Sequence, residues 1–263
     1  MKLENPIIQL QKELEKSNGD IKKLQCLFYK TSENIMNNYI LQINDLKIEL
    51  KELEFYFFDC EKHADIYVHQ NEIQKNTSNF LYVHDSWGNR GGLDLTFGNG
   101  QYYGGILIRG IKIDGKYISG PAKLRNYIVS KLPKEKTINS YKGLQEYFYS
   151  IKNNISFTEK HNSSDSTIFH STRFGLDEEK ASKYSQALYK FIDIDYMNAS
   201  PTKEFLNAKG NLETTKVKAI SFLSGIFESK TFNTTESGKN EIKKVQNSQN
   251  LIDYIKDFKK TCI

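Results

Sequence analysis

A carboxylate and an aromatic ring stand two residues apart within residues 52–56. If this segment is a strand, Glu54 and Tyr56 share one of its faces, because strand side chains alternate between the two faces. A single well-placed carboxylate can orient a water molecule and take its proton during hydrolysis. Arg109 could hold that carboxylate by a bidentate ion pair, which a lysine cannot form. The structural alternatives are a solvated glutamate on an edge strand and an arginine that makes only an ion pair.

Trp87, the only tryptophan of the chain, lies in a turn with glycines after it. An apolar wedge on such a loop can fill the gap that a base leaves when it is flipped out of a DNA duplex. The competing interpretation is a core anchor, because single tryptophans are usually largely buried.

Several side chains with metal-binding chemistry occur between residues 60 and 84, namely Cys60, His63, His69 and His84. Zinc sites usually combine paired cysteines or histidines at short spacings, and this set contains no second cysteine. We therefore expect no metal. Residues 97–105 are rich in glycine, but no Lys-Ser or Lys-Thr pair follows them as in a phosphate-binding loop. They predict a hairpin turn, and no cofactor is expected.

These candidate residues must be positioned by a sheet and by helices at both ends of the chain. Hydrophobic spacings of three and four predict two short helices within residues 6–45, with a break at residues 17–20. A helix should follow Pro121, a loop should occupy residues 152–166, and the chain after Pro201 should be helical. Strand-type runs begin near residue 47 and recur at residues 80–84, 92–97, 105–111 and 188–194. We predict an α+β fold with a curved antiparallel sheet, N-terminal helices and an added helical C-terminal tail.

Charge and composition limit the class of protein and its partners. The 263 residues carry a net charge of +5, and residues 201–263 hold 11 lysines and 7 acidic residues, hence +4 of it. This bias suggests a polyanionic partner, although a basic solvated helix gives the same count. No apolar run approaches the roughly 18 residues of a membrane span, and the polar N-terminus predicts no signal peptide. The 3 cysteines are widely spaced and predict no disulfide framework, so we expect a cytoplasmic protein.

Residues 105–111 form an apolar run that contains Arg109, and residues 119–124 read Ser-Gly-Pro-Ala-Lys-Leu. In this order, the two segments resemble the alkyladenine (3-methyladenine) DNA glycosylase family. The family has an apolar strand that ends in a functional arginine, followed by a Ser-Gly-Pro-x-Lys-Leu helix start. Upstream, residues 52–56 match the family's Glu-x-Glu-x-Tyr strand, whose second glutamate is its catalytic base. The resemblance covers about residues 30–200 and leaves residues 201–263 outside.

The resemblance assigns roles to individual residues of this chain. It implies that Glu54 and Arg109 are catalytic and that Trp87 intercalates into the duplex, where the family has a tyrosine. The base pocket that it implies consists of Tyr56, His69, His84 and Asp94.

Two of these positions leave a choice open. His69 and His63 are alternatives for the site histidine. Asp94 stands where well-studied members carry asparagine, and an ionised aspartate offers only hydrogen-bond acceptors. We therefore expect a preference for bases that present an N–H group, unless Asp94 lies on the strand surface and pairs with Arg90 or a lysine.

The function that the resemblance implies is that of a monofunctional DNA glycosylase. Such a hydrolase flips a modified or damaged base out of double-stranded DNA and cleaves its N-glycosidic bond, leaving an abasic site as in base-excision DNA repair. The base could be alkylated, or a hypermodified base of foreign DNA. We expect a monomer with N-terminal helices that pack on the core (residues 1–45), a glycosylase-like domain (residues 46–200) and a basic helical extension (residues 201–263). The rivals are a non-catalytic DNA-binding module that keeps the fold and a formyltransferase-like small-molecule domain, whose C-terminal barrel is a fold relative of the family.

Trp87→Ala tests the expected wedge. The substitution should weaken binding to a duplex that carries a modified base more than binding to single-stranded DNA, because only a duplex has a stack to be filled. Titration of the two labelled DNAs measures the difference. Equal losses on both substrates would assign Trp87 to folding instead.

Overall fold

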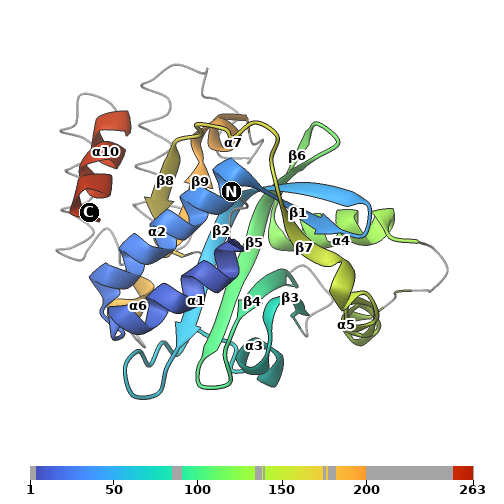
Figure 1. Ribbon diagram of the computed structural model, residues 1–263, viewed down its shortest axis with the longest axis horizontal. Helices are drawn as coiled ribbons and strands as arrows, with labels where there is room; N and C mark the ends of the chain where they lie inside the picture. Colours follow the sequence, from blue (N-terminus) through green and yellow to red (C-terminus); the bar gives the residue numbers. More distant parts are fainter. Residues whose placement is uncertain are drawn as a thin grey trace.

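The computed structural model describes residues 4–84, 91–133, 138, 140–173, 176, 182–199 and 251–262. They form an α+β fold in which helices pack around a curved antiparallel sheet, which confirms the fold class predicted from the sequence (Figure 1). The helices are α1 (Pro6–Ser17), α2 (Ile21–Asn38), α3 (Glu72–Asn76), α4 (Pro121–Lys131), α5 (Tyr141–Ser150), α6 (Ser182–Ser185), α7 (Ile194–Ala199) and α10 (Leu251–Thr261), with the 3-10 turn η1 (Lys152–Asn154). The strands are β1 (Tyr39–Ile43), β2 (Leu46–Phe58), β3 (Ser78–Val83), β4 (Leu93–Phe97), β5 (Tyr103–Ile113), β6 (Lys116–Ser119), β7 (Ile155–Glu159), β8 (Ile168–Ser171) and β9 (Lys190–Asp193).

Strand β2 is the axis of the sheet. Its 13 residues pair with β5 along one edge, while β1 and β9 pair with different parts of the other edge. The main strand order is β3-β4-β5-β2-β1-β7, with β6 beside β5 and the β8–β9 pair beside β2. The β2–β5 register is irregular near Leu50 and Glu52, and such irregularities bend a strand pair.

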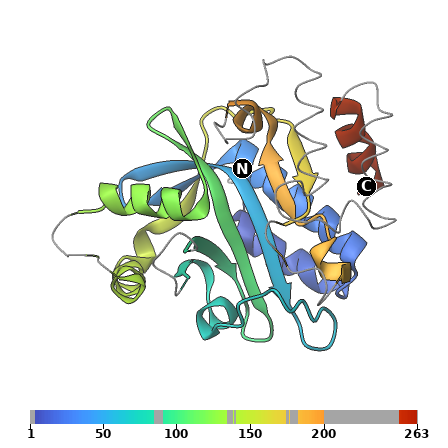
Figure 2. The same cartoon turned by 180° about the vertical axis from the view of Figure 1, so that it is seen from behind.

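Helices α1 and α2 cover one face of this sheet. In Figure 2, which shows the molecule from behind, β2 and β5 lie in front of these two helices. Phe28 of α2 stacks on Phe55 of β2, with 4.5 Å between ring centroids. Leu53 and Phe57 join the same buried cluster. Because strand side chains alternate, the even-numbered residues of this part of β2 point to the opposite face, where the predicted site residues belong.

The two N-terminal helices follow from local signals. Asn5 and Asp20 cap α1 and α2 by accepting hydrogen bonds from backbone N–H groups. The break between the helices needs Gly19, whose φ is +72° and whose missing Cβ makes room for the backbone carbonyl of Lys62.

Three predictions about the elements need correction. The helical region ends at Asn38, not near residue 45, because β1 follows it and turns into β2 at Asn44, which has a positive φ of 52°. Residues 155–159, predicted as loop, form β7 on the sheet edge beside β1. This strand is only partly buried, so it lacks the hydrophobic alternation that marks an interior strand. Helix α5 was also missed. The hairpin turn predicted for residues 97–105 is confirmed as the connection between β4 and β5.

The C-terminal helix α10 packs beside β8 and α2 (Figure 1). Its Phe258 stacks on His170 of β8 with 3.8 Å between ring centroids, and it meets Tyr29 of α2 edge-on. Ile255 is buried in a second hydrophobic cluster, together with Tyr196 of α7. A helical C-terminal end was predicted, and α10 confirms it for residues 251–261; residues 201–250 lie outside the described residues.

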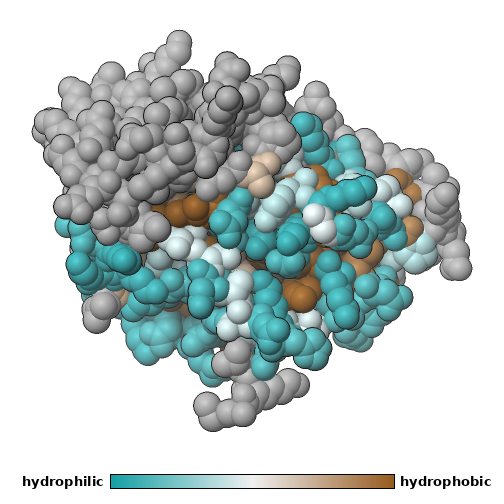
Figure 3. Space-filling model, turned by 90° about the horizontal axis from the view of Figure 1, so that it is seen from above, coloured by the Kyte–Doolittle hydropathy of each residue, from teal (hydrophilic) through white to brown (hydrophobic). Residues whose placement is uncertain are grey.

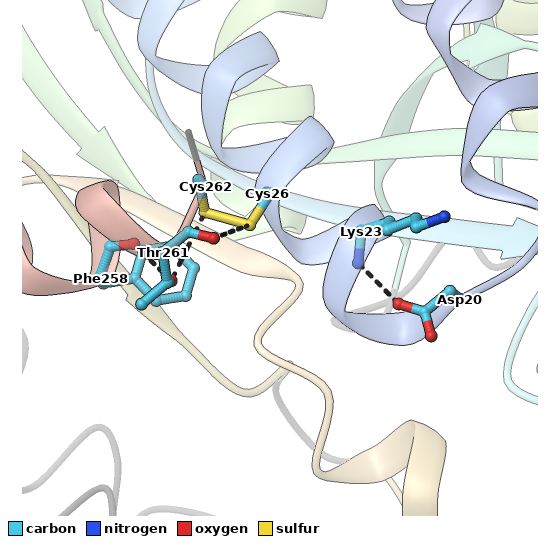
Figure 4. Close-up of a disulfide and its surroundings, with 6 residues drawn as sticks. All are labelled: Asp20, Lys23, Cys26, Phe258, Thr261 and Cys262. Atoms are coloured by element: carbon cyan, nitrogen blue, oxygen red, sulfur yellow. Dashed lines mark hydrogen bonds between the residues drawn. A yellow bond between two sulfur atoms is a disulfide. The ribbon is translucent and has the colours of Figure 1, made fainter.

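A disulfide joins Cys26 of α2 to Cys262 at the end of α10 (Figure 4). The wide spacing of the cysteines predicted no such bond, and this prediction is wrong. The two residues are 236 positions apart in the sequence, yet the packing of α10 brings their Cα atoms to 5.0 Å, within the range that a disulfide spans. Cys60 is exposed and unpaired.

The described surface is mainly polar. In the view of Figure 3, hydrophilic side chains dominate and hydrophobic ones form small separate patches. The large hydrophobic side chains that are exposed in the described part of the chain are Ile8, Ile66 and Tyr149. Among the described helices, none has the length and apolar character needed to cross a bilayer.

Cys26→Ser should destabilise the protein because it frees α10 from α2. Removing a native disulfide typically costs about 2–4 kcal/mol, which for a chain of this size lowers Tm by on the order of 5–10 °C. Thermal unfolding with and without reductant measures the effect. Cys60→Ser is the matched control and should melt as the parent does. A parent protein whose Tm is unchanged by reductant would contradict a stabilising disulfide.

Candidate active site

One line of residues crosses six strands on the face opposite α1 and α2. Asp94 of β4 and Glu54 of β2 both lie opposite Leu107 of β5, so their side chains share a face. The pairings of β3, β9 and β8 extend the line on both sides. From β3 to β8 it consists of Tyr82, Asp94, Leu107, Glu54, Lys190 and Ser171. Glu54, the predicted catalytic base, and Asp94, the predicted pocket residue, therefore lie in the same row.

Two carboxylates and two cations form a buried group at the centre of this row. Arg109 Nε lies 3.2 Å from Glu52 Oε1 and 3.4 Å from Glu54 Oε1, and Nη1 donates to Glu54 Oε2 at 3.4 Å. Lys190 Nζ lies 3.0 Å from Glu52 Oε1 and 3.7 Å from Glu54 Oε1. The predicted contact between Arg109 and Glu54 is present, but Arg109 is shared with Glu52. We call these four residues the central quartet.

Glu52 is the more tightly held carboxylate of the central quartet. Tyr196 of α7 donates a hydrogen bond to its Oε2 at 3.2 Å. Burial opposes its ionisation, but Lys190 and Arg109 outweigh burial and hold the pKa of Glu52 below its usual value of 4.5. A side chain at Gly110, opposite Glu52 in the sheet, would overlap the ring of Tyr196.

Tyr56 sits beside Glu54, as the two-residue spacing predicted. Its hydroxyl donates to Glu54 Oε2 at 3.1 Å. Burial and the charge of Glu54 raise the pKa of Tyr56 well above 10, so the hydroxyl stays a donor. The guanidinium of Arg173 lies 4.7 Å from the ring centroid of Tyr56 and forms a fully buried ion pair of 2.7 Å with Asp65. Arg173 thus holds the ring of Tyr56 in place.

Asp94 is 1 % exposed and hydrogen-bonded within the protein. Its Oδ1 lies 2.7 Å from Nε2 of His84, and its Oδ2 accepts from the side-chain amide of Gln74 at 2.8 Å. A Cβ at Gly105 would lie 2.6 Å from that amide nitrogen and 2.9 Å from Oδ2. Asp94 was expected to accept an N–H from the base; within the protein, His84 and Gln74 each contact one of its oxygens.

The two candidate histidines occupy different surroundings. His63 is buried: its Nδ1 lies 3.0 Å from the carbonyl oxygen of Gly19, and its ring stacks on Phe57. Burial lowers the pKa of His63, which favours the neutral ring. His69 is exposed, and its ring centroid lies 4.8 Å from that of His84. Of these two histidines, His69 is the one whose ring lies beside His84. Trp87 lies outside the described residues.

Several supporting residues were missed by sequence reasoning. Glu52 was noted only as part of the motif, Lys190 was covered only by the strand run at residues 188–194, and Gln74 and Tyr196 carried no signal. Their roles arise from strand pairing and helix placement, which no local pattern reveals. Within the described residues, no group of three or more His, Cys, Asp or Glu side chains is arranged to hold a metal ion.

A scan against models of known protein families finds no match for this chain, and a search among curated proteins finds none either. The glycosylase resemblance therefore depends on the short motifs alone.

Glu52→Gln should destabilise the fold in a pH-dependent way. Removing one partner of a buried ion pair leaves the cations undercompensated and costs about 3 kcal/mol near pH 7. Because the pKa of Glu52 is lowered in the folded state, its stabilising contribution is present above pH 4.5 and is lost as the pH falls through the folded value. The difference between parent and variant in urea unfolding should therefore shrink below pH 4.5.

Glu72→Gln serves as the control, because Glu72 is exposed and lies outside the central quartet, with hydrogen bonds from Asn76 of its own helix and, at 3.5 Å, from the hydroxyl of Tyr103. It should unfold like the parent at each pH. A Glu52→Gln deficit that stays constant down to pH 3 would contradict the ion-pair assignment.

Proposed function

We propose that this protein is a monofunctional DNA glycosylase that flips a modified or damaged base out of double-stranded DNA and hydrolyses its N-glycosidic bond. The observation that carries the proposal is the convergence of Glu54, Tyr56 and Arg109. Glu54 and Tyr56 of β2 and Arg109 of β5 were all singled out by motif. On one face of the sheet, Tyr56 contacts Glu54 at 3.1 Å and Arg109 contacts it at 3.4 Å.

Glu54 is the carboxylate best placed to act on water. Both cations of the central quartet lie nearer to Glu52, at 3.0 and 3.2 Å, than to Glu54, at 3.4 and 3.7 Å. We propose that Glu54, the carboxylate that lies farther from both cations, orients a water molecule and accepts its proton. Tyr56 fixes one oxygen of Glu54 by its hydrogen bond, which leaves the orientation of the carboxylate defined.

The cations balance the charges of the site. Arg109 and Lys190 offset the charges of the two carboxylates in a buried place. A negative charge beside the sugar stabilises the oxocarbenium character that develops as the base departs. Lys190 is engaged in ion pairs with Glu52 and Glu54, and an ammonium group has no lone pair with which to form a Schiff base. This arrangement supports hydrolysis by water over lyase chemistry.

The aromatic rings of the site could hold an extruded base. Tyr56 and His84 are half-buried, and His69 is exposed, whereas Glu54 and Asp94 are buried beneath them. Flat rings at the rim of a site offer stacking surfaces to a base of any sequence context. All of these groups come from a single chain, so the proposed site needs no second copy, and we propose a monomer.

We propose a cytoplasmic setting for this activity. The disulfide between Cys26 and Cys262 does not support that setting, because disulfides are rare in a reducing compartment. The competing function is that of a non-catalytic DNA-binding module that keeps the fold. It differs from the proposal only in that it releases no base.

Glu54→Gln should abolish release of the modified nucleobase and leave DNA binding nearly unchanged. The substitution removes the catalytic carboxylate but keeps the shape of the side chain. Loss of a general base typically lowers the rate by about 100-fold or more. Incubation with duplexes that carry different modified bases, followed by detection of abasic sites, measures release, and a filter or fluorescence titration measures binding.

The matched control is Glu49→Gln on the same strand, because Glu49 pairs with Lys51 and Lys160 outside the central quartet. It should retain the parent rate. Release by Glu54→Gln within about tenfold of the parent would exclude Glu54 as the base. A parent protein that binds DNA and releases no base from the panel would favour the non-catalytic module.

A further inference from the structure

A cavity of about 840 Å³ lies between α1 and α2 and is closed on one side by the end of α10. Both cysteines of the disulfide, Cys26 and Cys262, line this cavity, and Figure 4 shows how the bond joins α2 to the end of α10. Cavities of about 300–1,000 Å³ hold small molecules in many proteins. The disulfide can therefore be reached from a space that admits a small ligand.

The two cysteines differ in exposure. Cys26 is half-buried on α2, whereas Cys262 is only 6 % exposed. A thiolate breaks a disulfide by attacking one of its two sulfur atoms, and access decides which of them is attacked. Attack from the cavity should therefore fall on Sγ of Cys26, with Cys262 as the leaving thiolate.

Three exposed lysines of α2, Lys22, Lys23 and Lys30, line the same cavity. Lys22 and Lys30 stand four residues before and four residues after Cys26, so both neighbour it on the surface of the helix. The ion pairs formed by the described residues of this region involve other lysines and leave these three out. Their charges are thus available to a ligand that enters the cavity.

The acidic side chains of the cavity do not cancel this charge. Glu4 pairs with Lys12, and Glu13 pairs with Lys16 at 2.6 Å. Four lysines and two glutamates line the cavity, so its described lining carries a net charge of +2. A cavity of one sign of charge raises the local concentration of ligands of the opposite sign. Nearby cations also stabilise the thiolate that forms on Cys26 when the disulfide is opened.

We propose that Cys26 is a site of reversible S-thiolation, at which a small anionic thiol enters the cavity and opens the disulfide to Cys262. The thiolate sulfur of the ligand bonds to Sγ of Cys26 as the bond between the two cysteines breaks, and the electron pair of that bond passes to Sγ of Cys262. A second anionic thiolate then bonds to the sulfur of the ligand and leaves with it as a symmetric disulfide. Two ligand thiols are thereby oxidised, and the protein disulfide is reduced to two thiols. This exchange requires no glycosylase activity.

S-thiolation of Cys26 removes the covalent connection between α10 and α2. The helix is then held by noncovalent contacts, which include the stacking of Phe258 on His170 and the 2.7 Å ion pair of Lys259 with Glu33. The strength with which α10 docks therefore depends on the thiols around the protein.

Three thiols of similar size and different charge test the site: 2-sulfanylethanesulfonate, 2-sulfanylethanol and 2-sulfanylethylamine. The full chain with Cys60→Ser is used, so that the disulfide is the one position at which an adduct can form. Intact-mass measurement of acid-quenched samples gives the rate, and peptide mapping locates the adduct. At low salt, the sulfonate should react about tenfold faster per thiolate than the neutral alcohol, and the amine should react most slowly. Added salt should reduce the difference.

Variants separate the charge of the cavity from simple exposure. Lys22→Gln combined with Lys30→Gln should bring the rate of the sulfonate to within about threefold of that of the alcohol. Lys142→Gln on α5, which alters an exposed lysine outside the cavity, should react like the parent. Cys26→Ser should form no adduct, and the thiolated parent should melt at the temperature of Cys26→Ser.

An adduct on Cys262 would overturn the assignment to Cys26. Equal rates per thiolate for the three thiols, or the absence of any adduct on the folded protein, would overturn the anion-selective cavity. Rates that rise with urea in proportion to global unfolding would show that the thiol attacks the unfolded chain, and they would overturn the site as well.

Discussion

Two glutamates on one face of β2 place two negative charges in a buried site, and the architecture around them is arranged to compensate those charges. Arg109 from β5 and Lys190 from β9 flank β2 on its two edges, so each cation reaches both Glu52 and Glu54. A buried carboxylate without a partner would cost several kcal/mol or take up a proton. The pairing of β9 with β2 is therefore as necessary to the site as the glutamates themselves. It also explains why the chain returns to the central strand after β8.

Two glycines of β5 admit the side chains that brace the carboxylates. Gly110 leaves the space that Tyr196 occupies to reach Glu52, and Gly105 leaves the space that Gln74 occupies to reach Asp94. Tyr196 also packs in the second hydrophobic cluster with Ile255 of α10. A continuous set of contacts thus runs from the C-terminal helix through Tyr196 to Glu52. The disulfide that ties α10 to α2 stabilises the far end of these contacts.

Local patterns were sufficient for several of the elements. Alternating or continuous apolar runs correctly located β3, β4, β5 and β9, and the Gly-Pro start located α4, because each of these elements carries its own signal in neighbouring residues. The elements that were missed include β1, β7 and α5. β1 is a strand because it pairs with β2 across the turn at Asn44, and β7 is a strand because it pairs with β1. For β7, a pairing partner far away in the sequence decided the conformation.

The sequence by itself determined which groups could do chemistry at the site. The two-residue spacing of Glu54 and Tyr56 put them on one strand face, and the motif indicated that Arg109 would lie near them. Only the tertiary structure decided which of these side chains contact each other. The register between β4, β5 and β2 placed Asp94 in the row of Glu54, and the end of β3 placed His84 against Asp94. Likewise, the docking of α10 decided that Cys26 and Cys262 meet. Residue spacing along the chain fixes which face a side chain takes, whereas contacts between strands depend on register, which is set by the packing of the whole sheet.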